Sequence, residues 1–316
     1  MIFRIGCYCI IGLFLWSCNT PSSNGILKLQ ATDSIDTLKQ LISLGKELFS
    51  DQRLSQNNTI SCASCHQPRY AFTDKKPKSI GIHGREGRRN TPTLWNAKNQ
   101  DKFMWDGGVK SLELQAIVPI RDSNEMGENI SVLFHKLSAI KKYDSIAQQL
   151  YQRSFDPFVM TRALSAYQKS IYRENSAFDD WQKKGIINDS AIVRGYQLFT
   201  EHKCTACHSG NTFTNNSIQN NGIYQEGDDT GRYRITKDTN DIGKFKVPTL
   251  RNVAVTNPYM HDGSLKTLRE VILHHEQGGL ENATKSSLII PFELSKQERK
   301  DLIFFLKSLT DSAFVE

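Results

Sequence analysis

The chain has 316 residues, of which 38% are hydrophobic, and it carries 40 basic and 33 acidic residues. This length suits one large domain or two of ordinary size, and the apolar content excludes a wholly disordered chain and a multi-pass membrane protein. The formal charge of +7 is too small to require nucleic acid as a partner. Seven cysteines fall into two groups, three within the first 18 residues and four in two later pairs.

The first residues have the pattern of an export signal. Arg4 precedes an apolar run over residues 10–16, which is too short to cross a bilayer and is typical of a secretory signal. Residues 15–18 are similar to a lipoprotein processing site, so we expect a signal peptide over residues 1–17 and acyl chains on Cys18. Residues 18–33, rich in Ser, Thr and Asn, would tether the protein to a membrane. An ordinary signal peptide with an incidental cysteine is the alternative.

Two histidine-containing motifs use the remaining four cysteines. After a predicted helix with leucines at helical spacing over residues 38–48, C-x-x-C-H occurs twice, at Cys62, Cys65, His66 and at Cys204, Cys207, His208. In c-type haem attachment, the two thiols add to the haem vinyl groups and the histidine becomes the proximal iron ligand. A zinc ribbon or a thioredoxin-like pair is the alternative. Two complete copies in an exported chain favour two covalently bound haem c groups, on the periplasmic side of the bacterial cell envelope.

The haem motifs belong to a diverged repeat. Gly45-Lys-Glu-Leu-Phe49 precedes the first motif and Gly195-Tyr-Gln-Leu-Phe199 precedes the second. Residues 91–96 match residues 247–252, and residues 105–107 match residues 261–263, in both cases 156 positions later. We therefore predict an all-α fold of two tandem class I cytochrome c-like haem domains, with long loops and few strands. The domains would span residues 34–185 and 186–316.

The repeat also predicts different roles for the two haems. Pro119 lies 14 residues after Trp105, and His275 lies 14 residues after His261. Proline has no ligating side chain, whereas histidine is a common metal ligand, so the first iron would be open and the second closed. His274, Met260 and a merely packed core histidine are the alternatives to His275 as a ligand.

These phrases together resemble the bacterial dihaem cytochrome c peroxidase family, including its MauG-like branch. The resemblance runs from about residue 44 to residue 309 and rests on residues 45–49, 89–93, 105–107, 115, 119, 125–127 and 246–252. It implies that hydrogen peroxide is reduced at the N-terminal haem, with electrons arriving through the C-terminal haem from a small cytochrome c or copper protein. The family typically has Met, or Tyr in the MauG-like branch, where this chain has His275.

The resemblance also implies roles for individual residues. Glu125 matches the catalytic acid–base, Gln115 its hydrogen-bonding partner, and Trp105 the tryptophan between the haems. Helix-end surface residues and simple core packing are the plainer interpretations of these three. His83, in a glycine-rich loop, matches a histidine that can cap the first iron in the resting state; a solvated loop histidine is the alternative.

A calcium site is implied by the resemblance alone. Asn90, Thr256 and Pro258 match its ligands, through one amide oxygen and two backbone carbonyls, a donor type that suits Ca²⁺. No acidic cluster in the sequence would suggest this metal independently.

Three functions remain open from the sequence. A peroxidase is the leading prediction, and a MauG-like oxidase acting on Trp or Tyr of a protein partner is the second. The third is a dihaem electron-transfer protein without peroxide chemistry, against which the acid–base pair Gln115 and Glu125 argues. The electron donor and the oligomeric state, a homodimer included, are left open.

Overall fold

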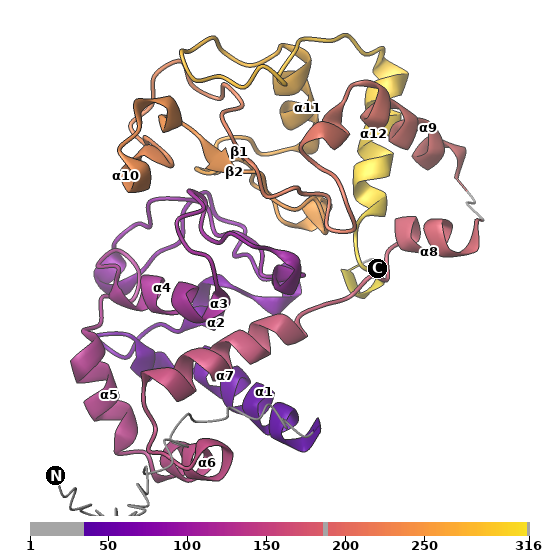
Figure 1. The fold of residues 1–316 in the computed structure, drawn as a ribbon. Helices are drawn as coiled ribbons and strands as arrows, with labels where there is room; N and C mark the ends of the chain where they lie inside the picture. Colours follow the sequence, from indigo (N-terminus) through magenta and orange to yellow (C-terminus); the bar gives the residue numbers. More distant parts are fainter. Residues whose placement is uncertain (1–34, 186–188, 315–316) are drawn as a thin grey trace, which may run out of the picture. The chain divides into compact units, whose positions relative to one another are not determined.

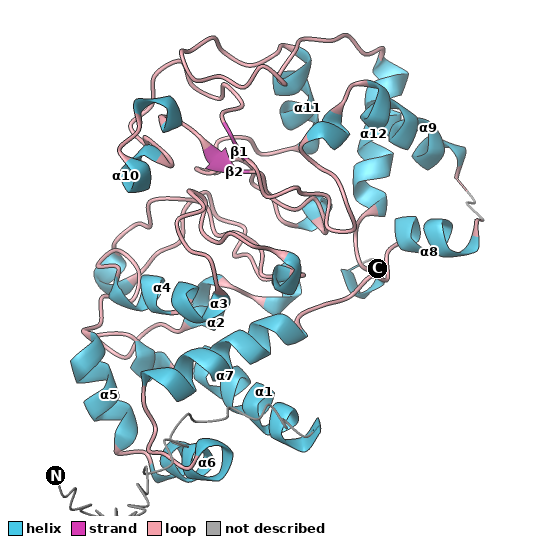
Figure 2. Cartoon of the chain, in the orientation of Figure 1, coloured by secondary structure: helices cyan, strands magenta, loops and turns pink. Residues whose placement is uncertain are grey.

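Helices and long loops make up most of the protein (Figure 1). The computed structural model describes residues 35–185 and 189–314, so the predicted signal peptide, the tether and the lipidation of Cys18 lie outside the described residues. Among those described residues, the two strands are β1 (Ile218–Gln219) and β2 (Phe245–Lys246), which pair antiparallel (Figure 2). The predicted all-α class with few strands is confirmed.

The first haem domain is built on the packing of α1 (Ile35–Phe49) against α7 (Pro157–Ser170). A Cβ atom at Gly45 of α1 would lie 1.9 Å from the carbonyl oxygen of Ala163 on α7, so only glycine allows this close approach. The shorter helices between them are α2 (Cys62–Cys65), α3 (Leu112–Gln115), α4 (Ile117–Arg121), α5 (Ile130–Ser138) and α6 (Lys141–Tyr151).

The second haem domain repeats this construction. Helix α9 (Ser190–Glu201) packs against α12 (Lys296–Ser308), and a Cβ atom at Gly195 would lie 2.1 Å from the Asp301 carbonyl oxygen. The glycine shared by the two predicted phrases is therefore a contact point between helices. The other helices of this half are α10 (Tyr233–Thr236) and α11 (Leu268–Glu276). Helix α8 (Ala177–Lys184) precedes the predicted boundary at residue 186, but its Phe178 packs in the core of this second domain.

Each domain has one buried asparagine at the same position of the repeat, and the two are 156 residues apart. Asn96 and Asn252 both have left-handed backbones, with φ of 57° and 60°. Asn96 donates its backbone N–H to Ile171 O just beyond α7 (2.9 Å), and Asn252 donates to Leu309 O just beyond α12 (3.1 Å). The Asn96 side-chain oxygen accepts the backbone N–H of Arg173 at 2.9 Å, and the Asn252 side-chain oxygen accepts that of Asp311 at 2.8 Å. The matching phrases thus fix the same helix end in both halves.

The domains exchange backbone hydrogen bonds through equivalent residues. Asn90 donates its N–H to His261 O at 2.7 Å, and Lys246 donates its N–H to Trp105 O at 2.7 Å. Asn90 and Lys246 are one repeat apart in sequence, as are Trp105 and His261. The contact between the domains therefore has approximate two-fold character.

The end of the chain also joins the two halves. Ser312 donates its backbone N–H to Asn175 O at 2.9 Å, and the Phe314 ring packs edge-on against Trp95 at 5.1 Å. Phe314 thereby extends the apolar core of the first domain. Within residues 35–185 and 189–314, no helix is both long enough and apolar enough to cross a membrane.

Candidate active site

The first haem motif lies on the single turn of α2. The backbone N–H of Ser61 donates to Ser64 Oγ at 3.0 Å, which fixes the start of a turn that carries Cys62 and Cys65 three positions apart. His66 follows at once, and its Nδ1 lies 3.0 Å from Phe72 O. Because Nδ1–H donates to this carbonyl, Nε2 is left free to bind a metal.

The second motif has the same local geometry. It occupies the 3₁₀ turn η5 (Cys204–Ala206), and His208 Nδ1 lies 3.0 Å from Phe213 O. Burial lowers the pKa of His208 to about 4, so its imidazole stays neutral, as an iron ligand must. The motif cysteines are not joined in disulfides. Both donor sets therefore fit covalently attached haem c.

Glu125 is held beside Pro119 by a tight turn. Pro119 lies on α4, and the chain folds back so that Met126 donates its N–H to Pro119 O at 3.1 Å. Burial, and then the nearby Asp122 carboxylate, raise the pKa of Glu125 to about 7. Burial chiefly, and to a smaller extent the Glu125 charge, raise the pKa of both thiols of the first motif, so Glu125 lies near them. The structure thus brings three features together: the first haem motif, Pro119, which has no ligating side chain, and the titratable carboxyl of Glu125.

His275 occupies the corresponding position in the second domain. It is on α11, and burial, followed by the charges of His274 and His208, lowers its pKa to about 3. The alternative ligands already have partners: His274 Nε2 lies 3.0 Å from Asn221 O, and Met260 Sδ accepts from Asn221 Nδ2 at 3.3 Å. Among the described residues no hydrogen bond reaches the His275 ring, which favours His275 as the ligand. Its ligation of iron stays a prediction.

Trp105 and Gln115 are placed less directly. Trp105 is half-buried where the domains meet, and its Nε1–H donates to Asn90 O at 2.7 Å. Gln115 is the last residue of α3, one helical turn before Pro119. No hydrogen bond between the Gln115 amide and the Glu125 carboxyl is found in the described part of the chain.

His83 lies in a turn next to the turn that carries Glu125. It is exposed, in a turn with φ of 56°, and its Nε2 lies 3.3 Å from Gln56 Oε1. The preceding Ile82 donates its N–H to Glu125 O at 2.8 Å, so this turn is bonded to the turn that carries the acid. Capping of the first iron by His83 stays a prediction.

The predicted calcium ligands come from two segments, Asn90 in one and Thr256 and Pro258, on either side of Asn257, in the other. Asn90 Nδ2 donates to Lys76 O at 2.9 Å, which turns its amide oxygen away from that carbonyl. Lys75 Nζ donates to Asn257 Oδ1 at 2.9 Å and brings a positive charge to this region. No group of three or more His, Cys, Asp or Glu side chains suited to a metal occurs within the described ranges. Calcium at Asn90, Thr256 and Pro258 stays a prediction.

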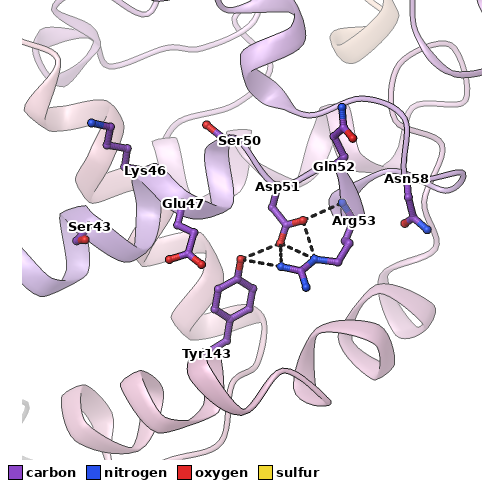
Figure 3. A pocket seen from close by; sticks show the side chains of 9 residues that line it. All are labelled: Ser43, Lys46, Glu47, Ser50, Asp51, Gln52, Arg53, Asn58 and Tyr143. Atoms are coloured by element: carbon purple, nitrogen blue, oxygen red, sulfur yellow. Dashed lines mark hydrogen bonds and ion pairs between the residues drawn. The ribbon is translucent and has the colours of Figure 1, made fainter.

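One pocket is separate from the predicted site. It lies where α1 ends and is lined by polar residues, none of them a predicted site residue (Figure 3). The Asp51 carboxylate accepts from Arg53 Nε at 2.8 Å and from the buried Tyr143 hydroxyl at 2.8 Å. This network joins the end of α1 to α6 and explains the polar lining structurally.

Sequence reasoning missed the charged residues between the domains. Arg89 stands out in the sequence only as one of several neighbouring basic residues, yet it pairs with Asp229 (2.6 Å) and Asp106 (2.7 Å). Lys246 opens one of the phrases that carry the family resemblance, but its burial depends on contacts with the other domain. The available signal was a lysine directly before the apolar pair Val247 and Pro248.

Comparisons with known proteins agree with this geometry. The family model described as di-haem cytochrome c peroxidase matches residues 39–186, and the cytochrome c model matches residues 192–310. The methylamine utilization protein MauG of Methylophilus methylotrophus is 33% identical over 94% of this chain and 91% of its own length. The cytochrome c551 peroxidase of Nitrosomonas europaea is 31% identical over 85% of this chain and 80% of its own.

A solved structure supports the same assignment. A MauG-like protein associated with microbial copper homeostasis has a TM-score of 0.82 and 30% identity, covering 88% of this chain and 91% of that one. The fold, the two haem motifs and these relatives agree along nearly the whole described chain. The chain therefore belongs to the family of dihaem cytochrome c peroxidases and MauG proteins.

Proposed function

We propose that the protein reduces hydrogen peroxide to water at the N-terminal haem, using electrons that pass through the C-terminal haem. The donor would be a small cytochrome c or copper protein. The observation that carries this proposal is the asymmetry of the repeat. Pro119 with the half-buried Glu125 lies on one side, and the half-buried His275 ring, which no hydrogen bond reaches among the described residues, lies on the other.

Glu125 has the properties that O–O bond cleavage requires. When bound, the first haem supplies an iron that activates the peroxide. A proton must then move from the inner to the outer oxygen, so that one water leaves; two electrons and two further protons complete reduction to two waters. With a pKa of about 7, the Glu125 carboxylate accepts and returns this proton near neutral pH. The Gln115 amide would hold the peroxide by hydrogen bonding.

Trp105 is the proposed intermediate for electrons. Its indole N–H is fixed by Asn90 O, and its carbonyl accepts the backbone N–H of Lys246 on β2 of the other domain. The ring is therefore held where the two haem domains meet. A large aromatic group in this place would shorten each electron-transfer step.

The remaining proposals concern location and metal. The sequence supports anchoring through Cys18 on the periplasmic side of the cell envelope, where c-type haem is attached. One Ca²⁺ at Asn90, Thr256 and Pro258 would stabilise the junction between the domains through neutral oxygen ligands.

Oxidation of a protein partner is the second candidate function. Relatives that are called MauG or MauG-like are as similar to this chain as the peroxidases, at 33% and 30% identity. A second haem closed by a protein side chain would suit storage of oxidising equivalents as well as relay. Its substrate would be Trp or Tyr on another protein.

Rapid mixing with hydrogen peroxide distinguishes these functions. A pyridine haemochrome assay first establishes two c-type haems per chain. Peroxide is then mixed with the protein in the presence and absence of a reduced cytochrome. Fast cytochrome oxidation supports the peroxidase, a long-lived oxidised spectrum without donor supports the oxidase, and no spectral response contradicts both.

A further inference from the structure

Lys246 is a buried cation for which the described residues supply no anionic partner. Only 9% of the residue is exposed, and within residues 35–185 and 189–314 its Nζ donates to one acceptor, the backbone oxygen of Val247, at 3.2 Å. Burial lowers the pKa of Lys246 to about 8, so the side chain still carries its charge at neutral pH. A buried ammonium group with one carbonyl acceptor is costly unless a further partner satisfies it.

The nearby acids do not supply that partner. Asp101 is the carboxylate that acts on Lys246, but it is exposed and already accepts from Lys102 Nζ, 3.1 Å away. Lys102 itself repels Lys246, so the pair has little net effect. The ion pairs of the domain junction use other cations, with Arg89 bound by both Asp106 and Asp229.

The position of Lys246 points to the haem as the source of the missing anion. It is on β2, and its backbone N–H donates to Trp105 O. Burial chiefly, and then the Lys246 charge, lower the pKa of His208, the predicted proximal histidine of the second motif, so Lys246 lies near that histidine. The haem bound at Cys204 and Cys207 brings two propionate carboxylates into this otherwise buried region. A carboxylate is the strong, charge-assisted acceptor that a buried ammonium lacks here.

We propose that Lys246 Nζ binds a propionate carboxylate of the C-terminal haem on the side that faces Trp105. Lys246 is thus a positioning residue, and the inference rests on haem attachment, not on which reaction the protein catalyses. The repeat supplies a contrast, because the equivalent residue in the first domain is Asn90. Asn90 carries no charge and its amide already donates to Lys76 O, so the first haem has no matching cation at this position.

A fixed positive charge beside one haem favours its reduced form, since the ferric form carries one more positive charge. Replacing Lys246 by Gln should therefore shift the equilibrium of the C-terminal haem toward the ferric form. We expect at least a tenfold shift, which is about 59 mV for one electron. Lys246→Arg keeps the charge, so the ferric–ferrous equilibrium of its C-terminal haem should stay within twofold of that of the wild type.

Spectroelectrochemical titration of the haem-loaded protein tests this assignment, after a pyridine haemochrome assay has counted two haems per variant. Lys244→Gln is the matched control, because Lys244 is on the same segment but lies 3.8 Å from Asp241. This control should shift the ferric–ferrous equilibrium of neither haem by more than twofold.

Several results would overturn the proposal. One is a Lys246→Gln variant in which the ferric–ferrous equilibria of both haems stay within twofold of the wild type. Another is a shift confined to the N-terminal haem. A Lys246→Arg variant that shifts as far as the Gln variant, or loss of the second haem from both variants, would also do so. Peroxide turnover plays no part in these readings, so failure here leaves the proposed peroxidase activity untouched.

Discussion

Replacing Glu125 by Gln should make the protein more stable and much less active at the same time. The pKa of Glu125 is raised from 4.5 to about 7, chiefly by burial. At about 1.4 kcal/mol for each tenfold change, ionising this carboxyl in the folded protein costs about 3 kcal/mol more than in the unfolded chain. Gln has nearly the same shape and removes that cost.

The sign of the pH dependence follows from the direction of the pKa shift. Below about pH 4.5 the carboxyl is protonated in both states, so wild type and Glu125→Gln should have equal free energies of unfolding. Between about pH 4.5 and 7 only the unfolded chain ionises, and the wild type loses stability relative to the variant. Above about pH 7 the difference should be constant, at up to about 3 kcal/mol. Urea unfolding near pH 4 and pH 9 measures both ends.

Peroxide turnover of the wild type should fall as the pH is lowered, whereas its stability relative to Glu125→Gln should rise. The wild-type kcat/KM should fall about tenfold for each pH unit below about 7, because the base becomes protonated. Glu125→Gln should lower turnover about 100-fold or more and lose this pH dependence, while the spectrum of the second haem stays unchanged.

The matched control is Glu86→Gln, an exposed carboxylate in the neighbouring loop whose contact is a distant pair with Lys78 at 4.0 Å. It should leave turnover and stability as in the wild type. Unchanged turnover in Glu125→Gln would refute the catalytic role, and equal stability of variant and wild type near pH 9 would refute the burial argument.

Three further predictions concern the second haem and the packing. In His275→Ala, the low-spin signal of one haem should disappear from the electron paramagnetic resonance spectrum, and its persistence would exclude His275 as ligand. Gly45→Ala places a Cβ atom 1.9 Å from Ala163 O, so urea unfolding should show a loss of about 1–3 kcal/mol; an unchanged midpoint would contradict the close approach. Asp179→Asn removes the carboxylate 2.8 Å from the buried Arg251 guanidinium and should cost about 3–5 kcal/mol in the same assay, whereas a loss below about 1 kcal/mol would show that the pair is not critical.

The sequence predicted the repeat well because the repeat depends on local constraints. Gly45 and Gly195 are required where helices touch, and Asn96 and Asn252 are required at left-handed positions that bind a helix end. Such requirements leave a recognisable residue at a fixed spacing. The haem motifs are equally local, because each one is completed within a single turn.

The features that the sequence did not reveal depend on contacts between distant segments. The raised pKa of Glu125 comes from the turn that folds it against α4, and the burial of Lys246 comes from contact with Trp105 in the other domain. Neither burial has a periodic signature in the sequence. His83 likewise could not be oriented, because an exposed turn with a left-handed residue can direct its side chain in several ways.

The contact of Phe314 with Trp95 has a consequence for how the protein matures. Synthesis begins at the N-terminus, so the first C-x-x-C-H motif, at residues 62–66, is complete long before residue 314 is added. The aromatic core beside that motif is nevertheless completed by Phe314, from the opposite end of the chain. The first domain can therefore reach its final packing only after the last residues of the second domain have been made and folded back onto it.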